Sequence, residues 1–171
     1  SVPSGNFGNI CAGLISMKLG LPISHFVAST NANDTVPRYM ESKIYKPLKT
    51  IETISNAMDV SNPSNFVRIL EIFNNFKSLK KNFSSYSFND IQTLDTVKKI
   101  FDKKSYVLDP HGAIGYLGIK KYMSMNKQST GIFLETAHPI KFSRVLEKKL
   151  NTKLVVPEKV TSSFSKAKTF Y

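Results

Sequence analysis

Ser1-Val2-Pro3-Ser4-Gly5-Asn6-Phe7-Gly8-Asn9 opens the chain, and the apolar run at residues 10–19 follows it directly. Gly5 and Gly8 bracket Asn6 and Phe7, so the backbone can turn tightly there. A glycine-rich turn at the start of a helix makes an anion site, because the amides of the first turn are unpaired and the helix dipole favours negative charge. The spacing alone also fits a plain turn that caps the helix through Asn6 or Asn9.

The first thirty residues predict a βαβ unit. Apolar residues recur at helical spacing after the glycine turn, and Gly20 then ends the helix, with Pro22 preventing its return. Residues 25–30 are short and apolar at their centre, as in a buried strand, and Ser1-Val2 reads as the end of another strand. Such units give parallel sheets that bind ligands at the carboxyl ends of their strands, where this turn lies. We therefore expect an α/β fold.

Further elements are expected along the chain. The sequence predicts helices after the turn at residues 31–34, at 65–76, from Asn89 or Asp90 to Phe101, at 111–123 behind Asp109-Pro110, and at 140–150. It predicts strands at residues 131–136 and 153–156, and exposed polar chain at 41–55 and 77–87. Residues 160–171 are expected to form a weakly ordered tail.

The composition indicates a globular protein with a basic surface. The chain has 171 residues and a formal net charge of +12, from 24 Lys and Arg against 12 Asp and Glu. The excess is almost entirely lysine and is spread along the chain without an arginine cluster, which favours a solvated surface over a nucleic-acid interface. No apolar run approaches the roughly 20 residues of a membrane span, no signal peptide opens the chain, and its one cysteine fits a reducing cytoplasm.

The remaining polar residues give weaker signals. The three histidines and Cys11 do not form a metal-ligand pattern, and Cys11 is expected to be buried. We expect His25 to be structural, His111 to pack or hydrogen-bond at a helix start, and His138 either to line a site or to hold its turn. A site near residues 33–38 is also open, since these residues follow the carboxyl end of a strand and Arg38 suits a phosphate or a surface ion pair equally well.

Five segments, in order, resemble threonine synthase, a pyridoxal-phosphate (PLP) enzyme of the tryptophan-synthase-β structural class. They are Val2-Pro3-Ser4-Gly5-Asn6-Phe7-Gly8-Asn9, Thr30-Asn31-Ala32-Asn33-Asp34-Thr35-Val36-Pro37-Arg38, Ser55-Asn56-Ala57-Met58-Asp59-Val60, Asp109-Pro110-His111-Gly112-Ala113 and Thr136-Ala137-His138-Pro139-Ile140-Lys141-Phe142. Each segment is short, but five in the family's order are specific. The resemblance covers roughly residues 1–156 and only the C-terminal portion of the enzyme.

The resemblance implies a cofactor site. The hydroxyl of Ser4 and the amides of Gly5, Asn6, Phe7 and Gly8 would cradle the PLP phosphate. Thr136 would lie against the pyridine nitrogen, where a neutral hydroxyl tunes the ring as an electron sink. Residues 1–159 would then form the C-terminal portion of the catalytic region, an incomplete parallel-sheet part of a fold type II PLP enzyme.

The implied reaction converts O-phospho-L-homoserine and water to L-threonine and phosphate. Asn33, Asp34 and Arg38 are candidate substrate-binding residues, and no metal is expected. The Schiff-base lysine of the family is expected on an N-terminal portion outside this sequence, so the 171 residues alone are expected to be inactive. We expect a cytoplasmic protein with no nucleic-acid or membrane partner. The alternatives are a related lyase, such as a threonine dehydratase or a phospholyase, and a non-catalytic basic binding module.

Overall fold

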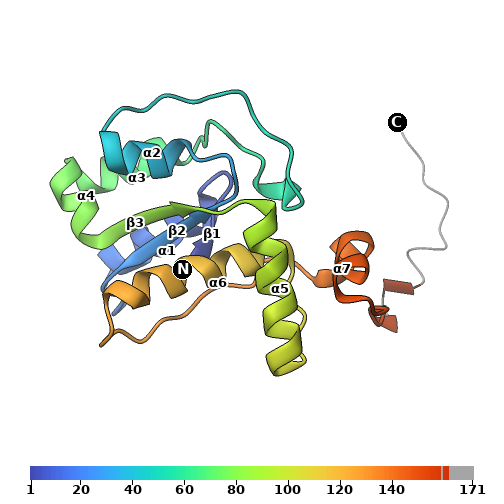
Figure 1. Cartoon of the computed structure of the whole chain (residues 1–171). Helices are drawn as coiled ribbons and strands as arrows, with labels where there is room; N and C mark the ends of the chain where they lie inside the picture. The colour runs from blue at the N-terminus through green and yellow to red at the C-terminus, as the bar shows by residue number, and fades with distance from the viewer. Residues whose placement is uncertain (159, 162–171) are drawn as a thin grey trace.

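The computed structural model describes residues 1–158 and 160–161 and shows a mixed α/β arrangement (Figure 1). In chain order the elements are β1 (Val2–Pro3), α1 (Gly8–Lys18), β2 (Phe26–Thr30), α2 (Thr35–Ser42), η1 (Asn56–Met58), α3 (Phe66–Phe73), α4 (Phe76–Asn82), β3 (Phe83–Ser87), α5 (Asp90–Lys104), α6 (Pro110–Met125), η2 (Pro139–Phe142) and α7 (Ser143–Leu150), with η denoting 3-10 turns. The predicted tail, residues 160–171, lies outside the described residues except for its first two. Among the described helices, none is long and apolar enough to cross a membrane.

The three strands form one parallel sheet in the order β1-β2-β3, which confirms the predicted βαβ unit. Val2 pairs with Ala28, and Phe26 pairs with Phe83. Helix α1 lies on one face of the sheet and α6 on the other (Figure 1). Because side chains of a strand alternate between faces, Phe26 and Ala28 pack with α1 while Ser29 meets Gly118 of α6. All five residues of β2 are buried, as expected for a strand covered on both sides.

Helix α1 begins and ends where the glycines allow it. Phe7 takes the N-cap position in the left-handed region, with φ of 61°, and makes no side-chain cap bond. The prediction that Asn6 or Asn9 caps this helix is therefore wrong: Phe7 is held by burial against Phe66, with ring centroids 5.7 Å apart. At the other end Gly20, with φ of 107°, donates its amide to the carbonyl of Met17, so the predicted glycine stop is confirmed.

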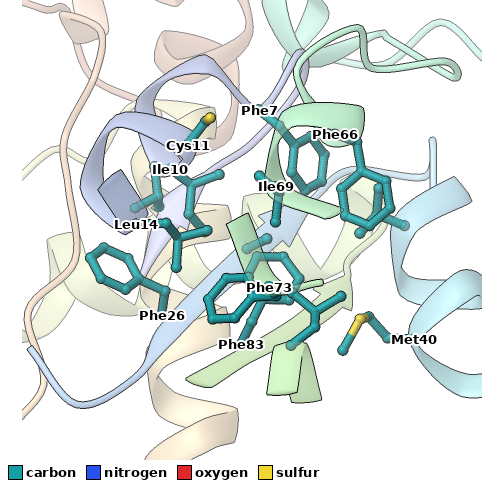
Figure 2. Packing of buried hydrophobic residues seen from close by; sticks show 14 residues of the cluster. Phe7, Ile10, Cys11, Leu14, Phe26, Met40, Phe66, Ile69, Phe73 and Phe83 are labelled. Atoms are coloured by element: carbon teal, nitrogen blue, oxygen red, sulfur yellow. The ribbon is translucent and has the colours of Figure 1, made fainter. Parts of the chain in front are cut away.

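The main hydrophobic core lies between α1, α3 and the sheet (Figure 2). Its largest fully buried members include Phe66, Phe83, Ile10, Leu14 and Ile69. A second cluster joins α5, α6 and α7 around Val97, Leu108, Ala113, Leu146 and Leu150. The glycine turn thus enters a helix whose apolar face is fixed by the main core, which holds the turn in place.

The region after Phe73 differs from the sequence prediction. Helix α3 stops at Phe73 because Asn74 takes a left-handed conformation with φ of 58°. The exposed polar stretch predicted for residues 77–87 is wrong, since it contains α4 and the edge strand β3, of which Phe83 and Ser85 are buried. Because three of the five residues of β3 are serines, its sequence lacks the apolar pattern of a strand. The strand is identified by its pairing with β2.

Two predicted strands are also absent from the described chain. Residues 131–136 form no regular strand, and Ile132 is 74% exposed. The segment nevertheless runs beside the start of β1: the amino group of Ser1 donates to Ile132 O (2.6 Å), and Leu134 N donates to Ser1 O (3.1 Å). Both hydrogen bonds are made by Ser1, the residue before β1, so the segment is held at the margin of the sheet without becoming a strand. Residues 153–156 are likewise irregular. The predicted helices at 111–123 and 140–150 are confirmed as α6 and as η2 with α7.

Candidate functional site

A pocket of about 450 Å³ lies at the carboxyl end of β1, where the glycine turn meets three other segments. Residues 3–10 form one wall, η1 forms a second, and His111 of α6 and the chain around η2 complete it. The lining residues outside the turn are Asn56, Ala57, Met58, His111, Thr136, Ala137, Lys141 and Phe142. The volume suits a small-molecule ligand. All the segments on which the resemblance rests, except residues 30–38, contribute to this one pocket.

The glycine turn presents free backbone donors. Ser4 N is paired with Ser29 O at 2.8 Å, which continues the sheet into the turn. For the amides of Gly5, Asn6, Phe7 and Gly8 the described part of the chain offers no hydrogen-bond acceptor. These donors lie at the positive end of α1, so the turn fits a phosphate without a cationic side chain.

Close contact with η1 fixes the position of Gly5. A Cβ built on Gly5 would lie 2.7 Å from Met58 Cα and 3.1 Å from Ala57 O, both of them backbone atoms. Glycine is therefore required here by space. The turn is also held from the outside, because Asn6 Oδ1 accepts from Ser64 N at 2.7 Å and Asn65 Nδ2 donates to Asn6 O at 2.9 Å.

Ser4 and Thr136, the two hydroxyl residues predicted to bind the cofactor, both line the pocket. Ser4 is buried and its Oγ donates to Val2 O at 2.8 Å, so donation to a phosphate requires that this bond be exchanged. Thr136 is exposed and follows irregular chain, so its expected place at the end of a strand is wrong although its place in the pocket wall agrees with the prediction. Both roles stay predictions.

The candidate substrate residues Asn33, Asp34 and Arg38 lie outside the pocket wall. Arg38 Nε donates to Asp34 at 2.8 Å, a partly exposed ion pair one helical turn apart. Asn33 pairs with the backbone of Ile51 in both directions, through bonds of 2.9 and 2.8 Å. All three side chains thus bond to other residues of this chain, and their contact with substrate stays a prediction.

Hydrogen bonds join residues 30–38 to residues 55–60, because Asp59 accepts from the side chains of both Asn31 and Asn33. Asn31 Nδ2 donates to Asp59 Oδ1 at 2.8 Å, and the other carboxylate oxygen accepts from Thr53 N at 3.0 Å. This partly buried network ties the end of β2 to the segment that carries η1. Since Met58 of η1 closes over Gly5, the network positions one wall of the pocket.

A group of ionisable side chains lies at the start of α6. Asp109 is the N-cap, as predicted, and its carboxylate accepts from His111 N at 2.8 Å and from His111 Nδ1 at 2.8 Å. The carboxyl of Glu135 lies against Gly112, where a Cβ would overlap it. Burial first, and then the charge of Asp109, raise the pKa of Glu135 to about 7.

The folded state should lose stability as pH rises towards about 7, because the raised pKa of Glu135 keeps its carboxyl protonated to a higher pH in the folded state than in the unfolded state. Its pKa is about 7 when folded and about 4.3 when unfolded, so the stabilisation is present below the lower value and lost as pH rises through the upper one. Replacing Glu135 with glutamine should reduce the difference in unfolding free energy between pH 5 and pH 8 by about 1 kcal/mol, a value discounted for solvent screening. Urea unfolding at both pH values measures it. Glu71→Gln, the same change on an exposed part of α3, should leave the difference unchanged; an equal effect of both variants would contradict this assignment.

The other predicted polar residues take structural places. His25 Nε2 bonds Ser84 Oγ at 2.9 Å and its ring stacks on Tyr122, and Cys11 is buried, so both expectations are confirmed. His138 is exposed outside this pocket and accepts from Ile140 N at 3.2 Å, which caps η2. The pocket residues Asn56, Met58 and Lys141 were not singled out from the sequence, although each lies in a segment that carries the resemblance.

Comparison with known proteins gives a consistent result. The family model "Threonine synthase, C-terminal" matches residues 112–171. A threonine synthase of Haemophilus influenzae is 50% identical over 158 residues, covering 92% of this chain and 36% of that protein. The crystal structure of threonine synthase from Escherichia coli has a TM-score of 0.87 and 40% identity, with 95% of this chain and 37% of that one covered. A PLP-bound threonine synthase from Brucella melitensis has the same TM-score with 27% identity, covering 99% and 42%.

These matches establish the fold and the family, and they also show what share of the relatives' length this chain spans. The α/β arrangement is part of the fold type II PLP architecture. The chain spans about 36% of the length of the Haemophilus influenzae relative and about 37% of the Escherichia coli structure. The chain therefore belongs to the threonine synthase family, whose C-terminal portion it matches.

Proposed function

We propose that this chain forms the C-terminal, cofactor-binding part of a threonine synthase, which converts O-phospho-L-homoserine and water to L-threonine and phosphate. The observation that carries the proposal is the pocket lined both by residues 5–8, whose amides have no acceptor in the described part of the chain, and by Thr136. A phosphate fits the amides, and the pocket volume suits a pyridine ring beside it. The PLP-bound relative from Brucella melitensis supports PLP as the ligand.

Each part of the pocket has a proposed task. The amides of residues 5–8 hold the cofactor phosphate, with Ser4 as a further donor. Thr136 places its hydroxyl at the ring nitrogen. When bound, PLP supplies an electron sink for the carbon atoms of the substrate, and a neutral hydroxyl sets the strength of that sink differently from a carboxylate. Asn33, Asp34 and Arg38 are kept as substrate-binding candidates beyond the pocket wall.

We propose that the rest of the enzyme completes the site with the Schiff-base lysine and covers an apolar face of this chain. The relatives are more than twice as long as the matched region. A second cavity of about 470 Å³ opens beside β1 and residues 131–134, and exposed apolar side chains surround it. They are Leu21, Ile23, Ile132 and Leu134. Apolar surface of this kind marks a contact with another part of a protein. Residues 1–159 would form the C-terminal part of the catalytic region, and 160–171 a tail.

Reconstitution with the missing part tests this function. We expect the 171-residue chain, combined with the N-terminal part of a threonine synthase and PLP, to release phosphate and form threonine from O-phospho-L-homoserine. Neither part alone should turn over. Threonine and phosphate are measured in the same samples, with the N-terminal part mixed with an unrelated α/β protein as the control. Release of a 2-oxo acid from threonine instead would indicate a dehydratase, and salt-dependent nucleic-acid binding without any PLP effect would indicate a binding module.

A further inference from the structure

Lys141 of η2 lines the pocket formed by the glycine turn and Thr136, and it is the one lysine or arginine among the described residues that line it. None of these lining residues is an aspartate or a glutamate. The described part of the chain offers Lys141 Nζ neither a hydrogen-bond acceptor nor an ion-pair partner, whereas Lys98, Lys149 and Lys153 pair with carboxylates. The pocket therefore holds a positive charge that the described residues leave uncompensated.

The backbone on both sides of Lys141 is fixed, so the base of its side chain stays in the pocket wall. Lys141 N donates to His138 O at 3.0 Å, and His138 Nδ1 caps η2 by accepting from Ile140 N at 3.2 Å. On the other side the ring of Phe142 packs on the imidazole of His111, with centroids 5.0 Å apart, and both rings line the same pocket. The flexible four-carbon stem of a lysine lets Nζ reach a ligand there without movement of the main chain.

The phosphate cradle of the glycine turn does not require this charge. Its proposed donors are the amides of residues 5–8 and the hydroxyl of Ser4, and they are enough for the three terminal oxygens of one phosphate. The positive end of α1 supplies the favourable potential for that phosphate. Lys141 is thus available for a second anion.

The proposed substrate brings such an anion. O-phospho-L-homoserine carries a phosphate monoester, which holds close to two negative charges at neutral pH. A lysine ammonium binds phosphate as a compact point charge with three donors. Arg38, the other cationic candidate, already pairs with Asp34 at 2.8 Å and lies outside the pocket wall. The uncompensated charge of Lys141 is therefore the better match for the substrate phosphate.

We propose that Lys141 is a substrate-binding residue, whose Nζ binds the phosphate group of the substrate and so favours phosphorylated over unphosphorylated amino acids at this site. This inference rests on the proposed function, because it requires a phosphorylated substrate in this pocket. The same charge holds inorganic phosphate, the product, which gives a readout of binding that does not depend on turnover. The phosphate of PLP is another source of the same chemistry, and the experiment separates the two.

Three substitutions test the role of this charge, all made in this chain joined to the N-terminal part of a threonine synthase. Lys141→Met keeps an unbranched, flexible side chain and removes the charge, and Lys141→Arg keeps the charge and the donors. Because Lys141 is exposed, neither change should disturb the fold. Lys99→Met is the matched control, since it removes the charge of an exposed lysine of α5 that lies outside the pocket wall.

The measurements on the PLP-loaded proteins are the KM for O-phospho-L-homoserine and the dissociation constant of inorganic phosphate, from the rise that phosphate causes in the melting temperature. The dissociation constant of PLP is measured separately from its absorbance change. We expect Lys141→Met to raise the first two values about tenfold and to leave PLP affinity within about twofold of the parent. Lys141→Arg should stay within about threefold of the parent in all three, and the control should match the parent. Affinity for L-threonine, which has a carboxylate but no phosphate, should not change in any variant.

The possible failures are distinguishable. If the unsubstituted joined protein does not form threonine from O-phospho-L-homoserine, the proposed function fails and the inference fails with it. If it forms threonine and Lys141→Met keeps the KM and the phosphate affinity of the parent, only the inference is overturned. A loss of PLP affinity as large as the loss of phosphate affinity would also overturn it, since Lys141 would then hold the cofactor phosphate. An equal loss of L-threonine affinity would assign Lys141 to the substrate carboxylate and overturn it as well.

Discussion

Replacing Gly5 with alanine is expected to disable the phosphate cradle and to destabilise the fold. The added methyl group would lie 2.7 Å from Met58 Cα and 3.1 Å from Ala57 O, which are backbone atoms that cannot rotate away. Either the turn or η1 must move. Overpacking of this kind costs about 1–3 kcal/mol in the unfolding free energy. Because the displaced amides are the proposed phosphate donors, PLP affinity should fall at least about tenfold, since that requires only ~1.4 kcal/mol of lost binding energy.

Gly8 provides the matched control in the same turn. A Cβ on Gly8 meets only Asn65 Nδ2, at 3.6 Å, which is an ordinary contact. Gly8 is also the first residue of α1, where alanine favours the helix, so Gly8→Ala should leave stability unchanged or raise it by up to about 1 kcal/mol. Urea unfolding of both variants measures the difference. Equal stability of Gly5→Ala and Gly8→Ala would mean that η1 does not press on the turn as described.

The sequence predicts those elements whose boundaries depend on local chemistry. Gly20 ends α1 because it reaches a positive φ that other residues avoid, and Asp109-Pro110 starts α6 because the carboxylate caps the free amides. Both boundaries are set by a few neighbouring atoms, so the pattern of residues suffices. The short apolar run at the start of β2 is likewise a local signal of a buried strand.

Elements that depend on distant partners were missed or misplaced. The strand β3 has a polar sequence and becomes a strand because β2 pairs with it over all five residues. Residues 131–136 have an apolar sequence typical of a strand, yet they find only Ser1 as a backbone partner in the described chain. Strand formation requires a pairing partner as well as propensity, and one sequence does not say where that partner lies.

The candidate site was likewise predicted only in part from the sequence. The glycine turn and Thr136, far apart in the sequence, meet in one pocket, as the resemblance implied. Arg38 was equally compatible with a phosphate or an ion pair, and the structure gives it Asp34 one turn away. Nε2 of His111, which has no hydrogen-bond partner in the described part of the chain, had no sequence signal, because this follows from what surrounds the imidazole in three dimensions.

Replacing Asp109 with alanine should produce the largest loss of stability among the ionisable residues discussed. This carboxylate caps α6 and also accepts from His111 Nδ1, with no exposure to solvent. Its removal leaves buried donors unpaired, each costing about 1–3 kcal/mol, in addition to a cap worth about 1 kcal/mol. The expected decrease in unfolding free energy is therefore about 3 kcal/mol. Asn89→Ala removes a comparable cap from α5, where Asn89 accepts from Gln92 N at 2.9 Å on the exposed surface.

The unfolding free energies of Asp109→Ala and Asn89→Ala should differ because water reaches only one of the two helix starts. Water replaces the lost acceptor at α5, so Asn89→Ala should cost only about 1 kcal/mol, whereas water cannot reach the donors at α6 without opening the packing. Asp109→Asn, which keeps one acceptor oxygen for the amide of His111 but loses the charge, should fall between the two. Urea unfolding of the three variants measures the order. If Asp109→Ala costs no more than Asn89→Ala, the buried contact between Asp109 and His111 does not stabilise α6.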